Sequence, residues 1–292
     1  MFADLAAIIA PTVLVAGLGY GWARLGYPFE LGFVTRIAFN VGAPSLIFAA
    51  LSAPPGGTLD LGSMAIAAGL AYVAFLALAW AVTRMARLDP AIYLPPLAFP
   101  NTGNMGLPLS LFAFGETGLA YGIAFFVTGT VLQFTVGVAV SSGRLGLKDL
   151  VRAPVLYATA AAVVLLVLGI TPPRWLLNTT RLVGDLTIPL MLLTLGVSLA
   201  RLQVSSFGRS AAFAVLRLAS GVAIGIGVAH LLGLEGAARG VTIIEATMPA
   251  AVLNYLLASR YQRQPEEVAG IILLSTLLSF LTLPALLSLA LG

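Results

Sequence analysis

Residues 95–108 read PPLAFPNTGNMGLP and lie inside a long apolar part of the chain, although they include four prolines, two glycines and two asparagines. A proline inside a helix removes the hydrogen bond to the carbonyl four residues earlier and bends or breaks the helix. In lipid the freed backbone groups need other partners, so irregular backbone is tolerated only where it is buried in protein or lines a cavity. This stretch therefore predicts a broken helix beside an internal cavity.

The composition of the whole chain is that of an integral membrane protein. Of the 292 residues, 60% are hydrophobic and 9% are charged, against roughly 45–50% and about 25% in soluble domains. A helix needs about 20 apolar residues to cross a bilayer, and runs of that length recur along the whole chain. We expect an all-α polytopic protein embedded in the lipid bilayer, with ten spans near 3–22, 31–51, 62–83, 92–114, 118–141, 153–170, 182–200, 211–233, 240–259 and 268–291.

The basic residues predict an orientation, because Lys and Arg are retained on the cytoplasmic side of a membrane. Near the connections after odd-numbered spans lie eleven of the fifteen basic residues: Arg24, Arg36, Arg84, Arg87, Arg144, Lys148, Arg152, Arg201, Arg209, Arg260 and Arg263. The opposite side has three: Arg174, Arg181 and Arg239. Both termini are therefore expected outside, in a multi-pass protein of the cell inner membrane. This topology accounts for the net charge of +4, so no nucleic-acid partner is expected.

The chain divides into two halves at a polar connection, residues 141–150, which reads SSGRLGLKDL near the midpoint. Five expected spans lie on each side of it. An odd number of spans in each half forces the halves to have opposite membrane orientation, which is the arrangement of many carriers that work by alternating access. We therefore expect two inverted five-helix repeats, residues 1–146 and 147–292.

Proline positions agree with this division. Pro44 of the second span corresponds to Pro189 of the seventh, 145 residues later, and Pro100 of the fourth span corresponds to Pro249 of the ninth, 149 residues later. Simple helix kinking can explain any one of these prolines. Their paired placement in both halves favours broken helices at matching places, which are the best sequence pointer to a transport site.

The two broken spans predict a binding site where they cross. Breaking a helix leaves a carboxyl end with partial negative charge and an amino end with partial positive charge, so crossed breaks offer amides to an anion and carbonyls to a cation. No Lys or Arg lies within the fourth, fifth or ninth span, so a bound anion is expected to depend on dipoles and amides. The alternative role of the same polar groups is to satisfy the broken backbone or to join helices. The candidate substrate-binding residues are Pro100, Asn101, Thr102, Asn104, Gln133, Pro249 and Asn254.

Two acids inside the apolar spans are candidates for coupling. Glu245 stands four residues before Pro249, and Asp185 stands in the seventh span; intramembrane acids are functional candidates by default. Glu245 can carry a coupling proton or hold a cation such as sodium together with nearby carbonyls. The structural alternatives are a permanently protonated Glu245, an Asp185 paired with Arg181 near the outer face, and Arg217 as the partner of either acid.

Other functional classes lack the residues they require. A hydrolase needs a positioned nucleophile and base, but the chain has a single histidine and no cysteine. A primary pump needs a nucleotide-binding motif such as GxxxxGK[ST], and the sequence has none. We therefore expect no enzymatic activity, no metal site and no cofactor.

Three stretches resemble the auxin efflux carrier family of bacteria, archaea and plants. They are residues 99–116, FPNTGNMGLPLSLFAFGE; residues 245–261, EATMPAAVLNYLLASRY; and residues 275–284, STLLSFLTLP. The resemblance implies an inverted five-plus-five fold similar to sodium/proton antiporters and bile-acid symporters, often as a homodimer. Spans one, two, six and seven would form a scaffold, and the remaining spans would form a moving, elevator-like core.

The resemblance also implies a function and a site. The fourth and ninth spans would cross at Pro100 and Pro249, with Asn101 and Gln133 matching residues that bind substrate in the family. Its substrates are organic anions, including auxin in plants and malonate or other carboxylates in some bacterial members. The expected function is secondary active transport of a small carboxylate. The alternative is a cation/proton antiporter or sodium-coupled symporter of the same fold, with Glu245 and Asp185 as the exchange acids.

Overall fold

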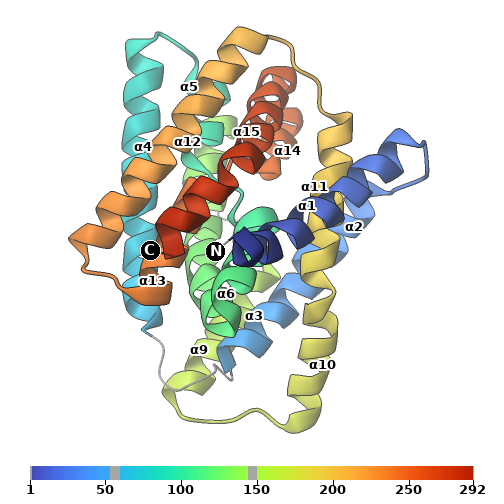
Figure 1. Ribbon diagram of the computed structural model, residues 1–292, viewed down its shortest axis with the longest axis vertical. Coiled ribbons are helices and arrows are strands. Elements are labelled where there is room, and N and C mark those ends of the chain that lie inside the picture. The colour runs from blue at the N-terminus through green and yellow to red at the C-terminus, as the bar shows by residue number, and fades with distance from the viewer. Residues whose placement is uncertain (1, 53–59, 144–149, 292) are drawn as a thin grey trace.

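A computed structural model describes residues 2–52, 60–143 and 150–291, and in these residues the regular structure is helical (Figure 1). The first half contains α1 (Phe2–Arg24), α2 (Leu31–Ile37), α3 (Ala43–Ser52), α4 (Leu61–Met85), α5 (Pro90–Ala98), α6 (Leu107–Leu132) and α7 (Val138–Ser142). The second half contains α9 (Pro154–Val167), α10 (Arg174–Asp185), α11 (Thr187–Arg201), α12 (Phe207–Leu231), α13 (Gly236–Thr247), α14 (Val252–Arg260) and α15 (Pro265–Leu291). The expected boundary between halves, at residues 146 and 147, lies outside the described residues.

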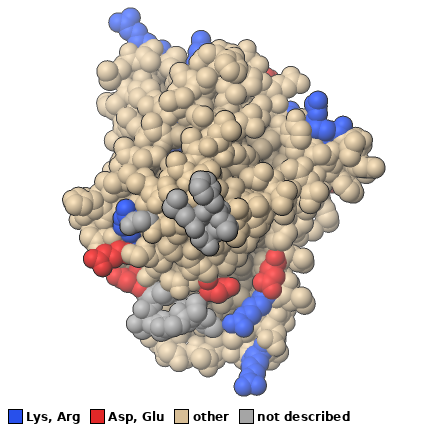
Figure 2. Space-filling view, viewed as in Figure 1, with Lys and Arg blue, Asp and Glu red and all other residues tan. Residues whose placement is uncertain are grey.

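The structure confirms an all-α, multi-pass membrane protein. Within the described residues, seven helical segments are long and apolar enough to cross a membrane: 5–24, 31–52, 61–85, 102–142, 174–201, 207–231 and 265–291. Figure 2 shows a face that is mostly uncharged, with acidic side chains gathered in its lower part. The expected spans 92–114 and 240–259 are interrupted, and the expected span 153–170 contains a helix of 14 residues, Pro154–Val167. The count of ten spans and the repeat architecture stay predictions.

In the described ranges, three short π-helical segments interrupt the regular helices: η1 (Ala38–Gly42), η2 (Thr102–Gly106) and η3 (Gln133–Gly137). Such wide turns are rare and frequently mark functional sites. A further break falls at Gly115 inside α6, where φ is 62° and ψ is −153°. The positive φ suits glycine, which has no Cβ to clash with the backbone. This break separates the segments expected to form the fourth and fifth spans.

The expected start of the seventh span, at residue 182, is wrong. The helical segment there begins at Arg174 with α10, and a turn at Leu186 separates α10 from α11. The error has a physical cause, because Arg174 and Arg181 lower the hydropathy of the part of α10 that precedes residue 182. A boundary placed by apolar character alone therefore starts too late.

The helices pack in two groups. In the first group α1 packs along α11, and α3 packs against α9 and α10. In the second group α12 packs against α13 and α15, and α4 packs against α5 and α6. Figure 1 shows α4, α12 and α13 on the left and α1, α2, α10 and α11 on the right. We call them the α1/α11 group and the α4/α12 group.

Close backbone approach holds α1 against α11. A Cβ built on Gly19 would overlap the backbone carbonyl of Leu193, and a Cβ on Gly196 would overlap the carbonyl oxygen of Ala16. Small residues let membrane helices approach closely enough for van der Waals packing to join them. The α1/α11 group therefore depends on glycine at these two positions.

We expect Gly19→Ala to lower the melting temperature of the detergent-solubilised protein, because the added Cβ has no room and overpacking costs about 1–3 kcal/mol. The control is Gly17→Ala in the same helix, where a Cβ would meet nothing within 4 Å. Thermal unfolding followed by circular dichroism measures both. Equal melting temperatures for the two variants would contradict the packing described here.

Candidate functional site

The two broken segments cross at an isolated antiparallel bridge between Pro100 and Ala250. The backbone N–H of Asn101 donates to the carbonyl oxygen of Pro249 at 2.7 Å, which ties the break after α5 to the break after α13. Buried backbone groups need such partners. The crossing predicted from the paired prolines is therefore present, and each break supplies hydrogen-bond partners to the other.

Asn254 reinforces the crossing from the side. Its Nδ2 donates to the carbonyl oxygen of Phe99 at 3.1 Å, and its Oδ1 accepts from Gln133 Nε2 at 2.9 Å. The same Phe99 oxygen also accepts from the backbone N–H of Ala251 at 3.1 Å. Both ends of the Asn254 amide are thus used within the protein, and its role in this structure is to brace the crossover and orient Gln133.

The carboxyl ends of the two broken helices meet at one buried arginine. Arg217 of α12 donates from Nη1 to Leu97 O at 2.7 Å, from Nε to Met248 O at 3.2 Å, and from Nη2 to Ala246 O. Its guanidinium also lies over the ring of Phe75, 4.2 Å from the centroid, a favourable cation–π geometry. The side chain is fully buried. Its positive charge offsets the partial negative charge at the ends of α5 and α13.

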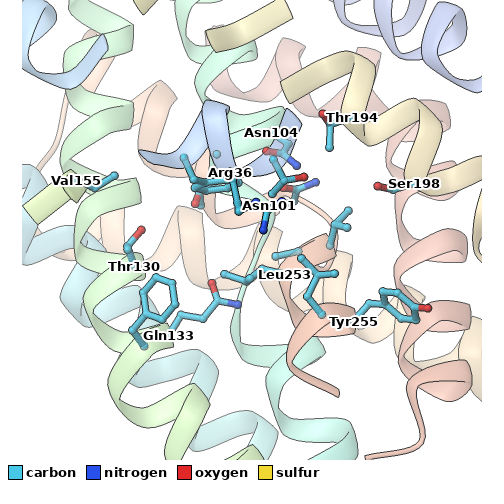
Figure 3. Close-up of a pocket in the computed structure, with 18 of the residues that line it drawn as sticks. Arg36, Asn101, Asn104, Thr130, Gln133, Val155, Thr194, Ser198, Leu253 and Tyr255 are labelled. Carbon is cyan, nitrogen blue, oxygen red and sulfur yellow. The ribbon is translucent and has the colours of Figure 1, made fainter. Parts of the chain in front are cut away.

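The amino ends of the other half-helices face a cavity of about 730 Å³ (Figure 3). We call it the crossover cavity. Thr102, Gly103 and Asn104 line it where η2 begins, and Val252 and Leu253 line it where α14 begins. The partial positive charge of helix amino ends favours an anion.

The crossover cavity brings together most of the expected binding residues. The expected residues that line it are Pro100, Asn101, Thr102, Asn104 and Gln133. Pro249 and Asn254 are buried but are not among the lining residues. They support the crossing from behind the wall that a ligand would touch.

Four buried polar atoms at the cavity lack a hydrogen-bond partner in the described part of the chain. They are Asn101 Nδ2, Asn104 Oδ1, Thr194 Oγ1 and Ser198 Oγ, and Figure 3 labels all four residues around the cavity. Buried polar groups in proteins nearly always have a partner. These atoms are therefore positioned to bind a ligand or water. The contribution of Thr194 and Ser198 from α11 was not expected, because their short hydroxyl side chains carry no distinctive sequence signal.

Among the described residues, the charged side chains that line the cavity are basic. They are Arg36, Arg152, Arg201 and Arg260, with no aspartate or glutamate from the same part of the chain. The expectation that an anion would depend on dipoles and amides alone is therefore incomplete. Arg36 and Arg201 belong to α2 and α11, outside the spans considered for the site. Arg36 lies five residues inside an apolar run, and this unusual position was the sequence signal that could have indicated an arginine at the site.

Glu245 lies behind the crossover rather than in the cavity. Its Oε1 accepts a hydrogen bond from Ser110 Oγ at 3.0 Å, and its Oε2 has no partner among the described residues. The carboxyl group packs against Gly106, where a Cβ would overlap it. Gly106 ends η2, which also contains Asn104. Among the described residues Arg217 makes no ion pair with Glu245. The alternative considered from the sequence, in which Arg217 is the partner of Glu245, is therefore wrong.

Asp185 is separate from the crossover. It is exposed at the end of α10 and lines another cavity, of about 610 Å³, together with Arg181 and Glu116. We call this the second cavity. Within the described ranges the ion pair that forms joins Arg209 to Glu267. Asp185 and Arg181, which were considered as a pair from the sequence, do not form one. The structure therefore does not bring the two candidate coupling acids together.

Comparison with known proteins places the chain among transporters. Residues 138–287 match the model of a family described as membrane transport proteins. An "Uncharacterized transporter" of Methanothermobacter thermautotrophicus is 31% identical over 293 residues, covering 95% of each chain. The chain belongs to the membrane transport protein family, the family of the auxin efflux carriers. A relative from Rhizobium meliloti is named "Putative malonate transporter" and is 26% identical over 308 residues, covering 98% of this chain and 95% of its own.

Membership in the membrane transport protein family makes this protein a membrane transporter. It agrees with the helical, multi-pass structure and with a cavity that lies at two broken helices. The resemblance seen in the sequence is thereby confirmed at the level of the family.

We expect Arg217→Met to destabilise the protein strongly. The substitution leaves carbonyls of Leu97, Ala246 and Met248 without their donor, and a buried group that loses its partner costs about 1–3 kcal/mol. The matched control is Arg209→Met, also in α12, whose side chain is 49% exposed and pairs with Glu267 at 3.7 Å. The Arg209 side of this pair is open to solvent, and ion pairs at the surface contribute about 0–1 kcal/mol. Thermal unfolding of both variants tests this, and a similar small loss in both would refute the capping role of Arg217.

Proposed function

We propose that the protein is a secondary transporter that moves a small organic anion by alternating access. The crossover cavity carries this proposal, because the described residues that line it include four arginines and no acid. Two unit charges 4 Å apart attract by about 4 kcal/mol at an effective dielectric constant near 20. This is enough to select an anion over a cation of similar size. The unpartnered atoms of Asn101, Thr194 and Ser198 supply directional contacts for its oxygens.

The orientation of the half-helices supports an anion rather than a cation. Carriers that bind sodium use unwound carbonyls and carboxyl helix ends as ligands. Here the carbonyls of Leu97, Ala246 and Met248 already accept hydrogen bonds from Arg217, while the amino ends at Thr102 and Val252 face the cavity. The alternative of a cation/proton antiporter or sodium-coupled symporter has no comparable cation site in the described residues. The anion is proposed to be a carboxylate, which the name of the Rhizobium relative also suggests.

Helix packing supports alternating access. The cavity lies between the two groups, since Arg36 and Ser198 come from the α1/α11 group and Asn101 and Gln133 come from the α4/α12 group. The first span of each half packs against the second span of the other half, since α1 contacts α11 and α9 contacts α3. Two inverted repeats would form these two contacts as an equivalent pair. Sliding of the α4/α12 group, with its crossover, along the α1/α11 group would carry the anion between the two sides of the membrane.

The proposed orientation follows from the arginines of the cavity. All four belong to the set of basic residues expected on the cytoplasmic side, whereas Arg181 of the second cavity belongs to the opposite set. We therefore propose that the crossover cavity opens to the cytoplasm and the second cavity to the outside. Both chain termini would then lie outside.

Glu245 is proposed as the coupling group of this carrier. Its Oε2 has no partner in the described chain, and its carboxyl packs against Gly106 at the end of the η2 segment that holds Asn104. A proton gained or lost by Glu245 would act directly on the backbone that presents Asn104 to the anion. Asp185 faces the second cavity, which makes it the weaker candidate for coupling.

Flux in proteoliposomes tests the function, with radiolabelled malonate as the first probe and other small carboxylates next. We expect saturable uptake, and we expect Asn101→Ala and Asn104→Ala to raise KM roughly ten- to hundredfold, because a hydrogen bond to a charged group contributes about 1.5–3 kcal/mol. The control is Asn178→Ala, an exposed amide on α10 that lines neither cavity. Melting temperatures of all variants separate binding from folding. No saturable flux of any carboxylate, under proton, sodium or voltage gradients, would overturn the proposal.

Glu245→Gln distinguishes the two transporter hypotheses. We expect saturable malonate flux to remain but to lose its dependence on an imposed proton gradient, because glutamine cannot release a proton. A cation/proton exchanger would instead lose exchange altogether. Flux is measured with and without a pH difference across the vesicle membrane, and an unchanged proton dependence in the variant would exclude Glu245 as the coupling group.

A further inference from the structure

A second sequence correspondence links the two cavities. Arg36 and Arg181 each stand eight residues before the paired prolines Pro44 and Pro189, and each follows a threonine. Both segments share the pattern Thr-Arg followed by proline at the same spacing. The separation of the arginines, 145 residues, equals that of the prolines.

The two segments meet in the structure at equivalent positions. Gly42 and Thr187 are also 145 residues apart in the sequence, and a Cβ built on Gly42 would lie closer to Thr187 Oγ1 than atoms can pack. Residues that are equivalent in two inverted repeats touch where the axis between the repeats passes. This contact supports treating Arg36 and Arg181 as the same position in the two halves.

Each arginine faces a different cavity. Arg36 lines the crossover cavity and Arg181 lines the second cavity. Both side chains are exposed, and neither has a hydrogen bond or ion pair with the residues that the structure describes. Each is therefore available to an anion that arrives from its own side of the membrane.

The residue one helical turn after each arginine breaks this equivalence. Asn40 follows Arg36, whereas Asp185 follows Arg181, and residues four apart on a helix are neighbours. Asn40 lines the crossover cavity and Asp185 lines the second cavity. The second cavity is also lined by Glu116. Counting only residues that the structure describes, it has two acids and one arginine, whereas the crossover cavity has four arginines and no acid.

We propose that Asp185 sets the affinity for the anion on the second-cavity side by offsetting the charge of Arg181. The anion binds more tightly when the crossover faces Arg36 than when it faces Arg181, while the direction of net transport is set by the gradients across the membrane. This inference rests on the proposed function and adds a residue that determines the difference in affinity between the two faces. It assigns Asp185 a role that does not require the residue to gain or lose a proton.

The size of the effect follows from electrostatics in a wet cavity. An acid several ångströms from the anion, at an effective dielectric constant between that of a protein surface and that of water, changes affinity by roughly three- to tenfold. Without an imposed gradient, a passive carrier must keep the ratio of maximal rate to KM equal in both directions. The asymmetry therefore appears in KM, with a compensating difference in maximal rate.

The experiment measures KM for malonate from each face of the full-length protein in proteoliposomes. Because the chain has no cysteine, a single cysteine introduced at the amino terminus and blocked with an impermeant thiol reagent reports the orientation. We expect the wild-type KM to be lower on the crossover-cavity face. Asp185→Asn should lower KM on the second-cavity face by roughly three- to tenfold and leave the other face unchanged.

The arginines provide the opposite test. Arg36→Gln should raise KM only on the crossover-cavity face, and Arg181→Gln should raise it only on the second-cavity face. Matched controls are Arg24→Gln and Arg174→Gln, which carry the same charge change but line neither cavity, and which should alter neither KM. High salt should reduce the wild-type asymmetry, because it screens charges in water-filled cavities.

The outcomes separate this inference from the function on which it rests. No saturable carboxylate flux in the wild type would overturn both. Saturable flux with equal KM on both faces, or a change on both faces in Asp185→Asn, would overturn the role of Asp185 and leave anion transport standing. If Asp185→Asn is poorly folded by its melting temperature, Asp185→Ser gives the same charge change with a smaller side chain, and its KM decides.

Discussion

The hydrogen bonds from Arg217 to the carboxyl ends of the two broken helices are the constraint on which the site depends. A helix end that is buried without partners is costly, and here α5 and α13 both end inside the protein. One guanidinium holds the carbonyls of Leu97, Ala246 and Met248. The negative helix ends are thus neutralised on this side, and the positive amino ends of the other half-helices face the crossover cavity.

The charge distribution extends this division beyond the crossover. Asn101 and Asn104 offer amide groups from the α4/α12 group, while Arg36, Thr194 and Ser198 offer charge and hydroxyls from the α1/α11 group. An anion in the cavity would touch both groups at once. In the proposed mechanism, movement of one group along the other would change which charged residues the anion meets, and residues of the group that stays in place would set the affinity on each side.

Sequence rules were accurate where the physical cause is local. Pro100 and its neighbours predicted a break, and the break is present with Asn101 and Asn104 at a cavity. The start of the seventh span was wrong because polar residues of α10 hide a helix from a hydropathy argument. Asn254 was expected at the substrate, but both ends of its amide bind Phe99 and Gln133. An amide can bind substrate or brace the backbone, and the residue type and its position in the sequence do not distinguish these two roles.

Composition and the spacing of prolines were therefore sufficient to predict a multi-pass membrane protein with two broken helices, because hydropathy and backbone restrictions act within a few turns of chain. The direction of the half-helices, the capping by Arg217 and the basic lining of the cavity required the folded chain. The decisive contacts join residues more than a hundred positions apart, as from Arg217 to Leu97 and from Gln133 to Asn254. Only packing brings such residues together, so a linear pattern cannot specify which polar groups partner one another and which remain open to a ligand.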